Sequence, residues 1–432
     1  LKNRRESVWK GIPFVFIKKR QEAFCFRPVS YFQEGGQQMS SITESAKALM
    51  PKLSKIRRDF HEYPETSQNE VETSKKVAAY LKEMGCDEVI ENVGGHGVVG
   101  VIRGAHEGKV VGLRADMDAL QIQEMNDVEY KSRNDGVMHA CGHDNHMTGL
   151  LGAAELLLQR KDQIHGTVKL IFQPAEELSP IGGSRAMMDS GYLDDVEAVY
   201  GLHVWPDLPH GKIGVKAGPL MAATDHFTIH IHGKTAHGAK PDQGIDAAVL
   251  GAQFIVNAQS IVSRRVNPLD NAVVTFGIIN AGTRYNIIAG DCLLDGTVRT
   301  LNEDTRDMIE DAIRKQLDAL CLQSGATADI TYGRGYPALV NHEEDAALIR
   351  KTAISLFGED EVEDVKLPAM PAEDFSFYLQ RKKGAFVWLG TAKEGQEAYP
   401  LHNSRFDVDE DILWRGASLL AQTAIDYLAQ QK

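Results

Sequence analysis

The sequence VVGLRADMD (residues 110–118) carries the pattern that decides the fold, a short apolar run that stops at acidic residues. The pattern returns in TVKLIFQPAEE (167–177), and a third apolar run, 196–202, stops at His203. Continuous apolar runs of this length are typical of strands that are buried on both faces, as in the parallel sheets of α/β proteins. Because functional groups in such sheets gather beyond the carboxyl ends of the strands, these polar residues are expected at one shared edge.

Predicted helices alternate with these strands along most of the chain. Helices are expected at 43–60, 68–84, 145–161, 343–357, 373–382 and 409–430, and further strands at 98–103 and 385–390. The texture changes at 219–332, where Phe227, Ile229 and Ile231 alternate with polar residues, a period of two that indicates a half-exposed strand. The predicted element order in this segment is β-α-β-β-α-β, the ferredoxin-like arrangement.

These patterns predict an α/β fold with two domains. A mixed-sheet domain with helices on both faces would comprise 39–218 and 333–432, and a ferredoxin-like α+β domain would be inserted at 219–332. A chain of 432 residues fits two or three domains.

Bulk composition excludes several classes of function. The formal net charge of -13 opposes binding to nucleic acid or to an anionic membrane, which would need a basic face. No apolar run approaches the ~20 residues that span a bilayer. The five cysteines are few and widely spread, which is no disulfide framework, so a reducing compartment and a cytoplasmic location are expected.

The first residues differ from the rest of the chain. Residues 1–38 mix basic residues with scattered aromatics and show neither a helical nor a strand period. We expect a disordered upstream extension, because Met39 is followed by a helical pattern and would make a natural start. An organellar transit peptide is the rival interpretation, and Glu6, Glu22 and Glu34 weaken it.

Potential metal ligands follow the predicted strands. They are Asp116, Asp118, Glu176, Glu177, His203 and His402, together with the run HACGHD (139–144) before a predicted helix. Thiolate, imidazole and carboxylate together suit Zn²⁺, Co²⁺, Mn²⁺ or Ni²⁺, whereas Mg²⁺ or Ca²⁺ would not need sulfur and nitrogen ligands. Two adjacent glutamates can also divide the work, one as a ligand and the other as a base.

Each of these residues also has an ordinary explanation. Cys141 alone would usually be a small buried apolar residue, and His203 a core or cap histidine. Glu176 and Glu177 alone would begin a helix, and the two aspartates would be turn residues. Their joint placement after successive apolar strands favours a site.

Six runs resemble the signatures of a known family. They are RADMDAL (114–120), MHACGHDNH (138–146), FQPAEE (172–177), GLHVWP (201–206), EDFSFY (373–378) and LHNSRFD (401–407). Together they resemble the aminoacylase/carboxypeptidase superfamily of two-metal peptidases, peptidase family M20. Within it they are similar to the amidohydrolase branch of hippurate hydrolases, N-acyl amino acid amidohydrolases and plant hydrolases of IAA-amino acids. The resemblance extends from about residue 43 to the C-terminus.

The resemblance implies a catalytic metallopeptidase-like domain with two divalent ions, Mn, Zn, Co or Ni. The implied ligands are Cys141, His143, Glu177, His203 and His402. Glu176 would be the general base. Asp118 matches an aspartate that orients a metal-binding histidine in other branches, and Asp116 stands where those branches carry that histidine.

The resemblance also implies that the insert is a lid and dimerisation domain, so a homodimer or higher homo-oligomer is expected. His237, in GKTAHGAKP (233–241), would stabilise the oxyanion of the reaction. Asn286, in AGTRYNIIAG (281–290), and Arg299 would hold the carboxylate of the substrate. An alternative for Arg299 is a plain surface charge.

The predicted function is metal-dependent hydrolysis of the amide bond of small N-acyl amino acids. A dipeptidase or carboxypeptidase with the same metal site is the alternative. A catalytically inactive binding protein and a thiol hydrolase that uses Cys141 and His143 are two further alternatives. The intact ligand set argues against the first of these two, and activity that survives chelation would favour the second.

Overall fold

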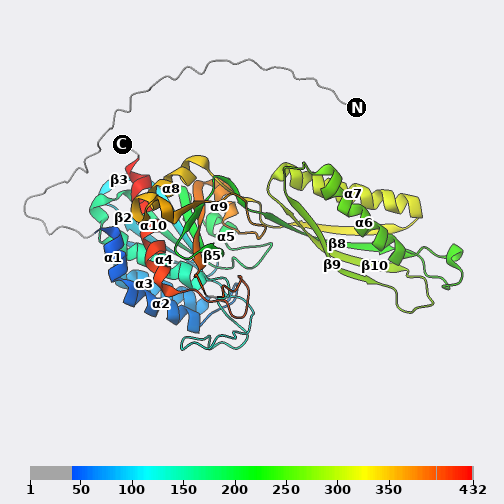
Figure 1. Ribbon diagram of the computed structural model, residues 1–432, viewed down its shortest axis with the longest axis horizontal. Helices are drawn as coiled ribbons and strands as arrows, with labels where there is room; N and C mark the ends of the chain where they lie inside the picture. Colours follow the sequence, from blue (N-terminus) through cyan, green and yellow to red (C-terminus); the bar gives the residue numbers. More distant parts are fainter. Residues whose placement is uncertain (1–40, 396, 431–432) are drawn as a thin grey trace, which may run out of the picture. The chain divides into compact units, whose positions relative to one another are not determined.

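The computed structural model describes residues 41–395 and 397–430, which fold around two large separate sheets (Figure 1). The predicted extension 1–38 lies outside these residues. The main sheet has eight strands in the order β1-β2-β4-β3-β5-β14-β6-β13. Their bounds are β1 Glu88–Val93, β2 Gly97–Arg103, β3 His106–Asp116, β4 His165–Gln173, β5 Val196–Pro209, β6 Ile213–Val215, β13 Val362–Asp364 and β14 Lys383–Ala392.

The four central strands of this sheet, β4, β3, β5 and β14, run parallel. Asp116 at the end of β3 pairs in register with Gln173 at the end of β4, so their carboxyl ends share one edge. β2 is antiparallel to β4, and β6 is antiparallel to β14. The predicted mixed sheet is therefore confirmed.

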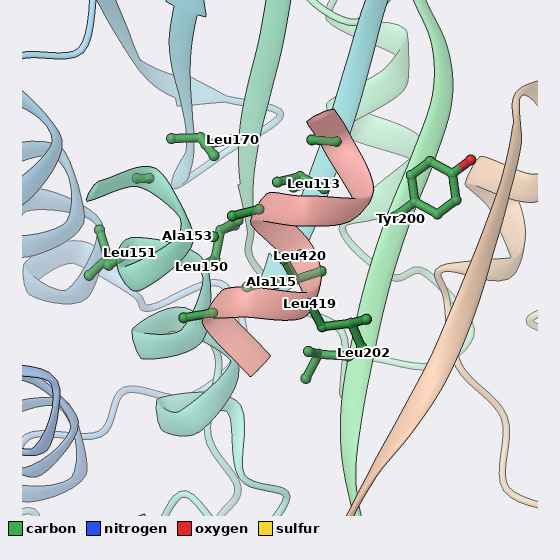
Figure 2. Packing of buried hydrophobic residues seen from close by; sticks show 14 of the residues in the cluster. Leu113, Ala115, Leu150, Leu151, Ala153, Leu170, Tyr200, Leu202, Leu419 and Leu420 are labelled. Carbon is green, nitrogen blue, oxygen red and sulfur yellow. The ribbon is translucent and has the colours of Figure 1, made fainter. Parts of the chain in front are cut away.

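Helices cover both faces of the main sheet. One face carries α1 Ile42–Ala48, α2 Met50–Glu62, α3 Val71–Met84, α4 His143–Leu158, α8 Glu343–Phe357 and α10 Leu413–Ala429, and the other carries α5 Ser184–Asp189 and α9 Ser376–Arg381. Figure 2 shows α4 and α10 side by side on the sheet, with Leu150 and Leu420 close to Leu113 of β3. Each fully buried side chain of this kind contributes about 1.5–3 kcal/mol.

The helix predicted at 43–60 is two helices. α1 ends at Ala48 and α2 begins at Met50, with Leu49 between them, and Pro51 lies in the first turn of α2. A proline has no N–H to donate, and its ring collides with the carbonyl four residues earlier, so it is tolerated in the first turn and not inside a helix. The prediction of one continuous helix was wrong for this reason.

The second large sheet is antiparallel, with the order β11-β8-β10-β9. Its elements are β8 Ala223–His232, α6 Ala247–Arg265, β9 Ala272–Ala281, β10 Asp291–Thr300, α7 Glu303–Ser324 and β11 Thr327–Arg334. This is the predicted β-α-β-β-α-β order, and α6 and α7 lie over one face of the sheet (Figure 1). Phe227, Ile229 and Ile231 are fully buried there.

One strand before this segment and one strand after it form a short two-stranded ribbon. It pairs β7 Gly218–Met221 with β12 Leu339–Asn341. The short 3-10 helices are η1 Lys161–Gln163, η2 Pro241–Gln243, η3 Glu359–Glu361 and η4 Glu410–Ile412. The exact domain limits and the lid role of the insert stay predictions.

Within the described ranges, no helix combines the length and the apolar character that crossing a membrane requires. The cysteines described there, Cys86, Cys141, Cys292 and Cys321, are all free thiols.

Candidate metal centre

The shared edge of the main sheet gathers the predicted ligands. Asp116 ends β3, Glu176 and Glu177 follow β4, His203 lies on β5, and His143 begins α4. His402 lies in the loop after β14. The chain thus brings residues from five separate segments to one place, as the parallel strand order requires.

Cys141, His143 and His203 form a buried group whose ligand atoms all lie within 4.8 Å of one another. The Nδ1 of His203 donates to the carbonyl of Val204 at 2.6 Å, which leaves its Nε2 free of a proton. That Nε2 lies 3.4 Å from the Sγ of Cys141. A ring fixed through one nitrogen so that the other faces its neighbours is the usual arrangement of a metal-binding histidine.

His143 is arranged in the same way. Its Nδ1 donates to the backbone carbonyl of Asp118 at 2.8 Å. Its Nε2 is buried and has no hydrogen-bond partner, and it lies 3.7 Å from Asp116 Oδ2 and 4.0 Å from Glu177 Oε1. An unpartnered buried polar atom costs about 1–3 kcal/mol, so the orphaned nitrogen indicates a missing partner.

Glu177 joins this group to His402. Its Oε1 is also buried without a hydrogen bond, although His402 Nε2 lies 3.2 Å away. The ligand atoms of Cys141, Glu177 and His402 lie within 4.8 Å of one another, so two candidate groups share Cys141. An imidazole nitrogen, a carboxylate oxygen and a sulfur that converge this closely fit a cation.

The electrostatics support a cation at this place. Burial alone would lower the pKa of His143, but Asp116, Asp118 and Glu177 raise it to about 10. Burial raises the pKa of Cys141 well above its ordinary value, and Glu177 and Glu176 add to this effect. In the protein alone, His143 and Cys141 therefore keep their protons, because the surrounding carboxylates carry an excess of negative charge. A sulfur, nitrogen and oxygen donor set in that position suits Zn²⁺, Mn²⁺, Co²⁺ or Ni²⁺.

Glu176 is buried beside the ligands. Its backbone N–H donates to Asp118 Oδ1 at 3.0 Å, and its Oε1 accepts from the N–H of Asp374 at 3.4 Å. Burial raises the pKa of Glu176 well above its ordinary value, and the charges of Glu373 and Glu177 raise it further. Its carboxyl group is thus shielded from solvent, and its ligand atom lies within 4.8 Å of those of His143 and Glu177.

Asp118 organises the loop that carries both glutamates. Its carboxylate accepts from the N–H of Glu176, from the N–H of Glu177 at 2.9 Å and from Ser67 Oγ at 2.6 Å. Its backbone carbonyl accepts from His143. One aspartate therefore aligns the candidate base and two candidate ligands.

A cavity of about 270 Å³ opens beside these residues. Its polar lining includes Cys141, Glu176, Glu177, His203, Arg299 and His402, and its apolar lining includes Met221 and Leu401. Arg299 comes from β10 of the insert, and its Nη1 donates to the carbonyl of Val298 at 3.1 Å. Of the described carboxylates, none forms an ion pair with it, so its charge is available to the cavity.

The other two residues predicted to contact substrate lie elsewhere. His237 is exposed, and the Gly238 N–H donates to the carbonyl of Asn286 at 2.8 Å, so His237 and Asn286 lie in adjoining loops. Neither residue lines the cavity that contains Glu176. The Ala239 N–H donates to His237 Nδ1 at 3.0 Å, which leaves His237 Nε2 to carry the proton.

Sequence reasoning assigned no role to His146. Its Nδ1 donates to Asp116 Oδ1 at 2.6 Å, and its Nε2 accepts from the Val204 N–H at 2.9 Å. Both ring nitrogens are used, so His146 orients Asp116 and is not free to bind a metal. Its place in the run MHACGHDNH was the available signal, but spacing alone did not separate it from His143.

The sequence patterns also did not indicate a buried charge cluster beside Glu176. Arg114 donates to Asp116 at 2.7 Å, to Glu373 at 3.0 Å and to Asp374 at 2.8 Å. The side chain of Arg114 is fully buried. The signal was an arginine inside an apolar strand, because a charged residue is almost never buried there unless it is paired.

Comparisons with known proteins agree with this geometry. The model of peptidase family M20/M25/M40 matches residues 112–426. Thermostable carboxypeptidase 1 of Saccharolobus solfataricus is 42% identical over 375 residues, which cover 86% of this chain and 94% of that protein. Hippurate hydrolase of Campylobacter jejuni is 38% identical over 382 residues, which cover 88% and 97%.

A solved structure adds to this result. The YXEP protein of Bacillus subtilis, described as a dinuclear metal binding peptidase from the M20 family, aligns with a TM-score of 0.77 at 35% identity. The alignment covers 89% of this chain and 99% of that one. The chain therefore belongs to peptidase family M20/M25/M40 and is a hydrolase that acts on amide bonds.

Proposed function

We propose that the chain hydrolyses the amide bond of small N-acyl amino acids with two divalent metal ions, Mn, Zn, Co or Ni. One observation carries the proposal, the two orphaned and buried ligand atoms, His143 Nε2 and Glu177 Oε1, beside Cys141. The proposed ligands are Cys141, His143, Glu177, His203 and His402. When bound, the ions supply Lewis-acid charge that polarises the amide carbonyl and eases the deprotonation of water.

Glu176 is the proposed general base. It takes a proton from the attacking water and later gives that proton to the nitrogen of the leaving amine, so it ends each cycle as it began. Its burial protects the proton from exchange with solvent, and Asp118 fixes the loop that carries it. Asp118 itself is proposed to act by positioning.

Arg299 is proposed to hold the carboxylate of the substrate. It is the cation of the insert that lines the cavity, and a guanidinium binds a carboxylate through two parallel hydrogen bonds. The apolar side chains of Met221 and Leu401 leave room for a small acyl group. Hippurate hydrolase among the relatives supports an N-acyl amino acid as substrate.

We propose that the insert acts as a lid and dimerisation domain. His237 and Asn286 would join the substrate by closure of this lid, with the His237 Nε2–H donating to the oxyanion and Asn286 to the carboxylate. A homodimer or a higher homo-oligomer is the proposed assembly, and the cytoplasm the proposed location.

A dipeptidase or carboxypeptidase is the second candidate. It is supported by the 42% identity to thermostable carboxypeptidase 1 and needs the same base and ligands. A thiol hydrolase is less well supported. Its nucleophile must be a thiolate, and burial raises the pKa of Cys141, which keeps the thiol protonated.

The test is a substrate panel with metal analysis. The protein, loaded with each of the four metals in turn, is assayed against N-benzoylglycine, other N-acyl amino acids and unblocked dipeptides. A higher kcat/KM for N-acyl amino acids than for dipeptides is expected. A preference for dipeptides would favour the second candidate, and activity with no bound metal would overturn the metal-dependent mechanism.

A further inference from the structure

His402 is the most exposed of the proposed ligands. It lies in a loop, its side chain is 51% exposed, and its backbone is left-handed with φ 64°. A residue other than glycine adopts this conformation only where its surroundings impose it. His143, by contrast, is fully buried at the start of α4. The His402 N–H donates to the carbonyl of Ala140 at 2.8 Å, which ties the backbone of His402 to the run that carries Cys141 and His143. The rest of the loop, which follows His402, needs an anchor of its own to hold this exposed side chain in place.

The loop after His402 is anchored by Asp407. Asp407 Oδ1 accepts from Arg57 Nη2 at 2.6 Å, and its Oδ2 accepts from Tyr130 Oη at 2.8 Å. The backbone adds a further bond, in which the N–H of Met125 donates to the carbonyl of Ser404 at 2.8 Å. Asp407 is thus a charged attachment of this loop to α2.

The same arginine holds the start of α4. Arg57 Nε donates to Asp144 Oδ2 at 2.9 Å, and Asp144 directly follows His143. Asp144 is fully buried, and the side chain of Arg57 is 1% exposed. The Nδ1 of His61 donates to the same Asp144 oxygen at 2.8 Å, which fixes this carboxylate further.

We infer that Arg57 is a positioning residue that bridges Asp144 and Asp407 and so sets the distance between His143 and His402. The inference rests on the proposed metal site. Charge-assisted hydrogen bonds are short and directional, and a rigid planar guanidinium with two carboxylates keeps their separation constant. Loss of a group that orients a ligand typically costs ~10–100-fold in metal affinity.

Substitutions at Asp407 and at Arg57 should have different effects on the two ligands. Asp407→Asn removes the charge on the His402 side only, and Arg57 keeps Asp144, with Glu410 Oε1 at 3.7 Å from its Nη1. The arginine stays compensated, so the protein should fold. Arg57→Lys keeps the charge but lacks the fork that reaches both carboxylates, so it should weaken both sides.

The matched control is Asp59→Asn. Asp59 also belongs to the ion pairs of α2, with Lys76 Nζ at 3.0 Å, but it is not connected to either ligand. Metal-free protein is titrated with Co²⁺, and the bound ions are counted by equilibrium dialysis. The thiolate-to-cobalt charge-transfer absorption band reports whether Cys141 binds the metal, independently of activity. Thermal unfolding of the metal-free protein reports stability.

In Asp407→Asn we expect the affinity for one of two cobalt ions to fall ~10–100-fold, with the thiolate band retained. Asp59→Asn should bind cobalt like the parent, and both variants should unfold near the temperature of the parent when metal-free. Unchanged cobalt affinity in Asp407→Asn, or a loss of metal-free stability without a change in affinity, would overturn the inference about Arg57 and leave the proposed function standing. A parent protein that binds no cobalt would overturn the proposed function with it.

Discussion

The edge of the main sheet and the loops of the insert place their proposed functional side chains in opposite ways. Cys141 and His143 are buried, and their positions follow from strand ends and a helix start. His237 and Asn286 lie in adjoining loops of the insert, and His237 is exposed. A buried atom without a partner indicates a ligand, whereas an exposed histidine is satisfied by water and indicates nothing until something covers it.

Arg299 lies between these extremes. It belongs to β10 of the insert, yet it lines the cavity with Glu176. Substitutions are therefore expected to change metal binding at the sheet edge, turnover at the lid loops and substrate affinity at Arg299.

Removal of the metal should have the largest effect. Chelation is expected to abolish activity, and Mn²⁺, Co²⁺, Ni²⁺ or Zn²⁺ should restore it. Bound ions at a thousand times their dissociation constant would stabilise the main domain by about 4 kcal/mol, while hydrogen exchange in the sheet of the insert should not change. Full activity in protein that elemental analysis shows to be metal-free would contradict this prediction.

Glu176 and Glu177, neighbours at the edge of the main sheet, are proposed to act as the base and as a metal ligand respectively. Glu176→Gln should lower kcat ~10²–10⁴-fold with metal content unchanged, because only the proton carrier is lost. Glu177→Gln should lower metal occupancy, because an anionic ligand is lost. Metal analysis and kinetics of both variants check this prediction. Metal loss in the first variant with retention in the second would show that the roles are reversed.

His237 tests the lid loops. His237→Gln should lower kcat ~10²–10³-fold, the usual cost of removing a donor to an oxyanion, and should leave the metal content of the protein unchanged. His230→Gln is the control, since His230 is another exposed histidine of the insert. Equal kcat values for the two variants would remove His237 from the reaction.

Arg299 should show the smallest effect of the four. Arg299→Gln is expected to raise KM ~10–100-fold, because a hydrogen bond to a charged group contributes about 1.5–3 kcal/mol. Substrate amides that lack the carboxylate should not respond. Arg264→Gln, at an exposed arginine of α6, controls for loss of charge on the insert. A similar change in KM for acid and amide substrates would mean that Arg299 does not read the carboxylate.

Much of the fold could be predicted from the sequence because its signals are local. The period of two in β8 placed Phe227 inward, and the apolar runs marked β3, β4 and β5. Short strands were missed, including β13 with three residues and no fully buried side chain. An element that buries little apolar surface leaves no periodic pattern.

The candidate site could be predicted in part for the same reason. Residues that follow strands, such as Glu177 and His203, are visible in the sequence order. The partners of Arg114 are not, since Asp374 lies 260 positions away in the chain. His143 and His146 illustrate the limit, because three residues apart on one helix they look equivalent.

The sequence by itself determined which elements form and which acidic, sulfur and imidazole groups stand at the ends of the strands. Only the tertiary structure decided which of those atoms are free. His143 keeps Nε2 without a partner, while both nitrogens of His146 are taken by Asp116 and Val204. The physical reason is that strand and helix patterns depend on neighbours in the chain, whereas a free ligand atom depends on hydrogen bonds between segments that only folding brings together.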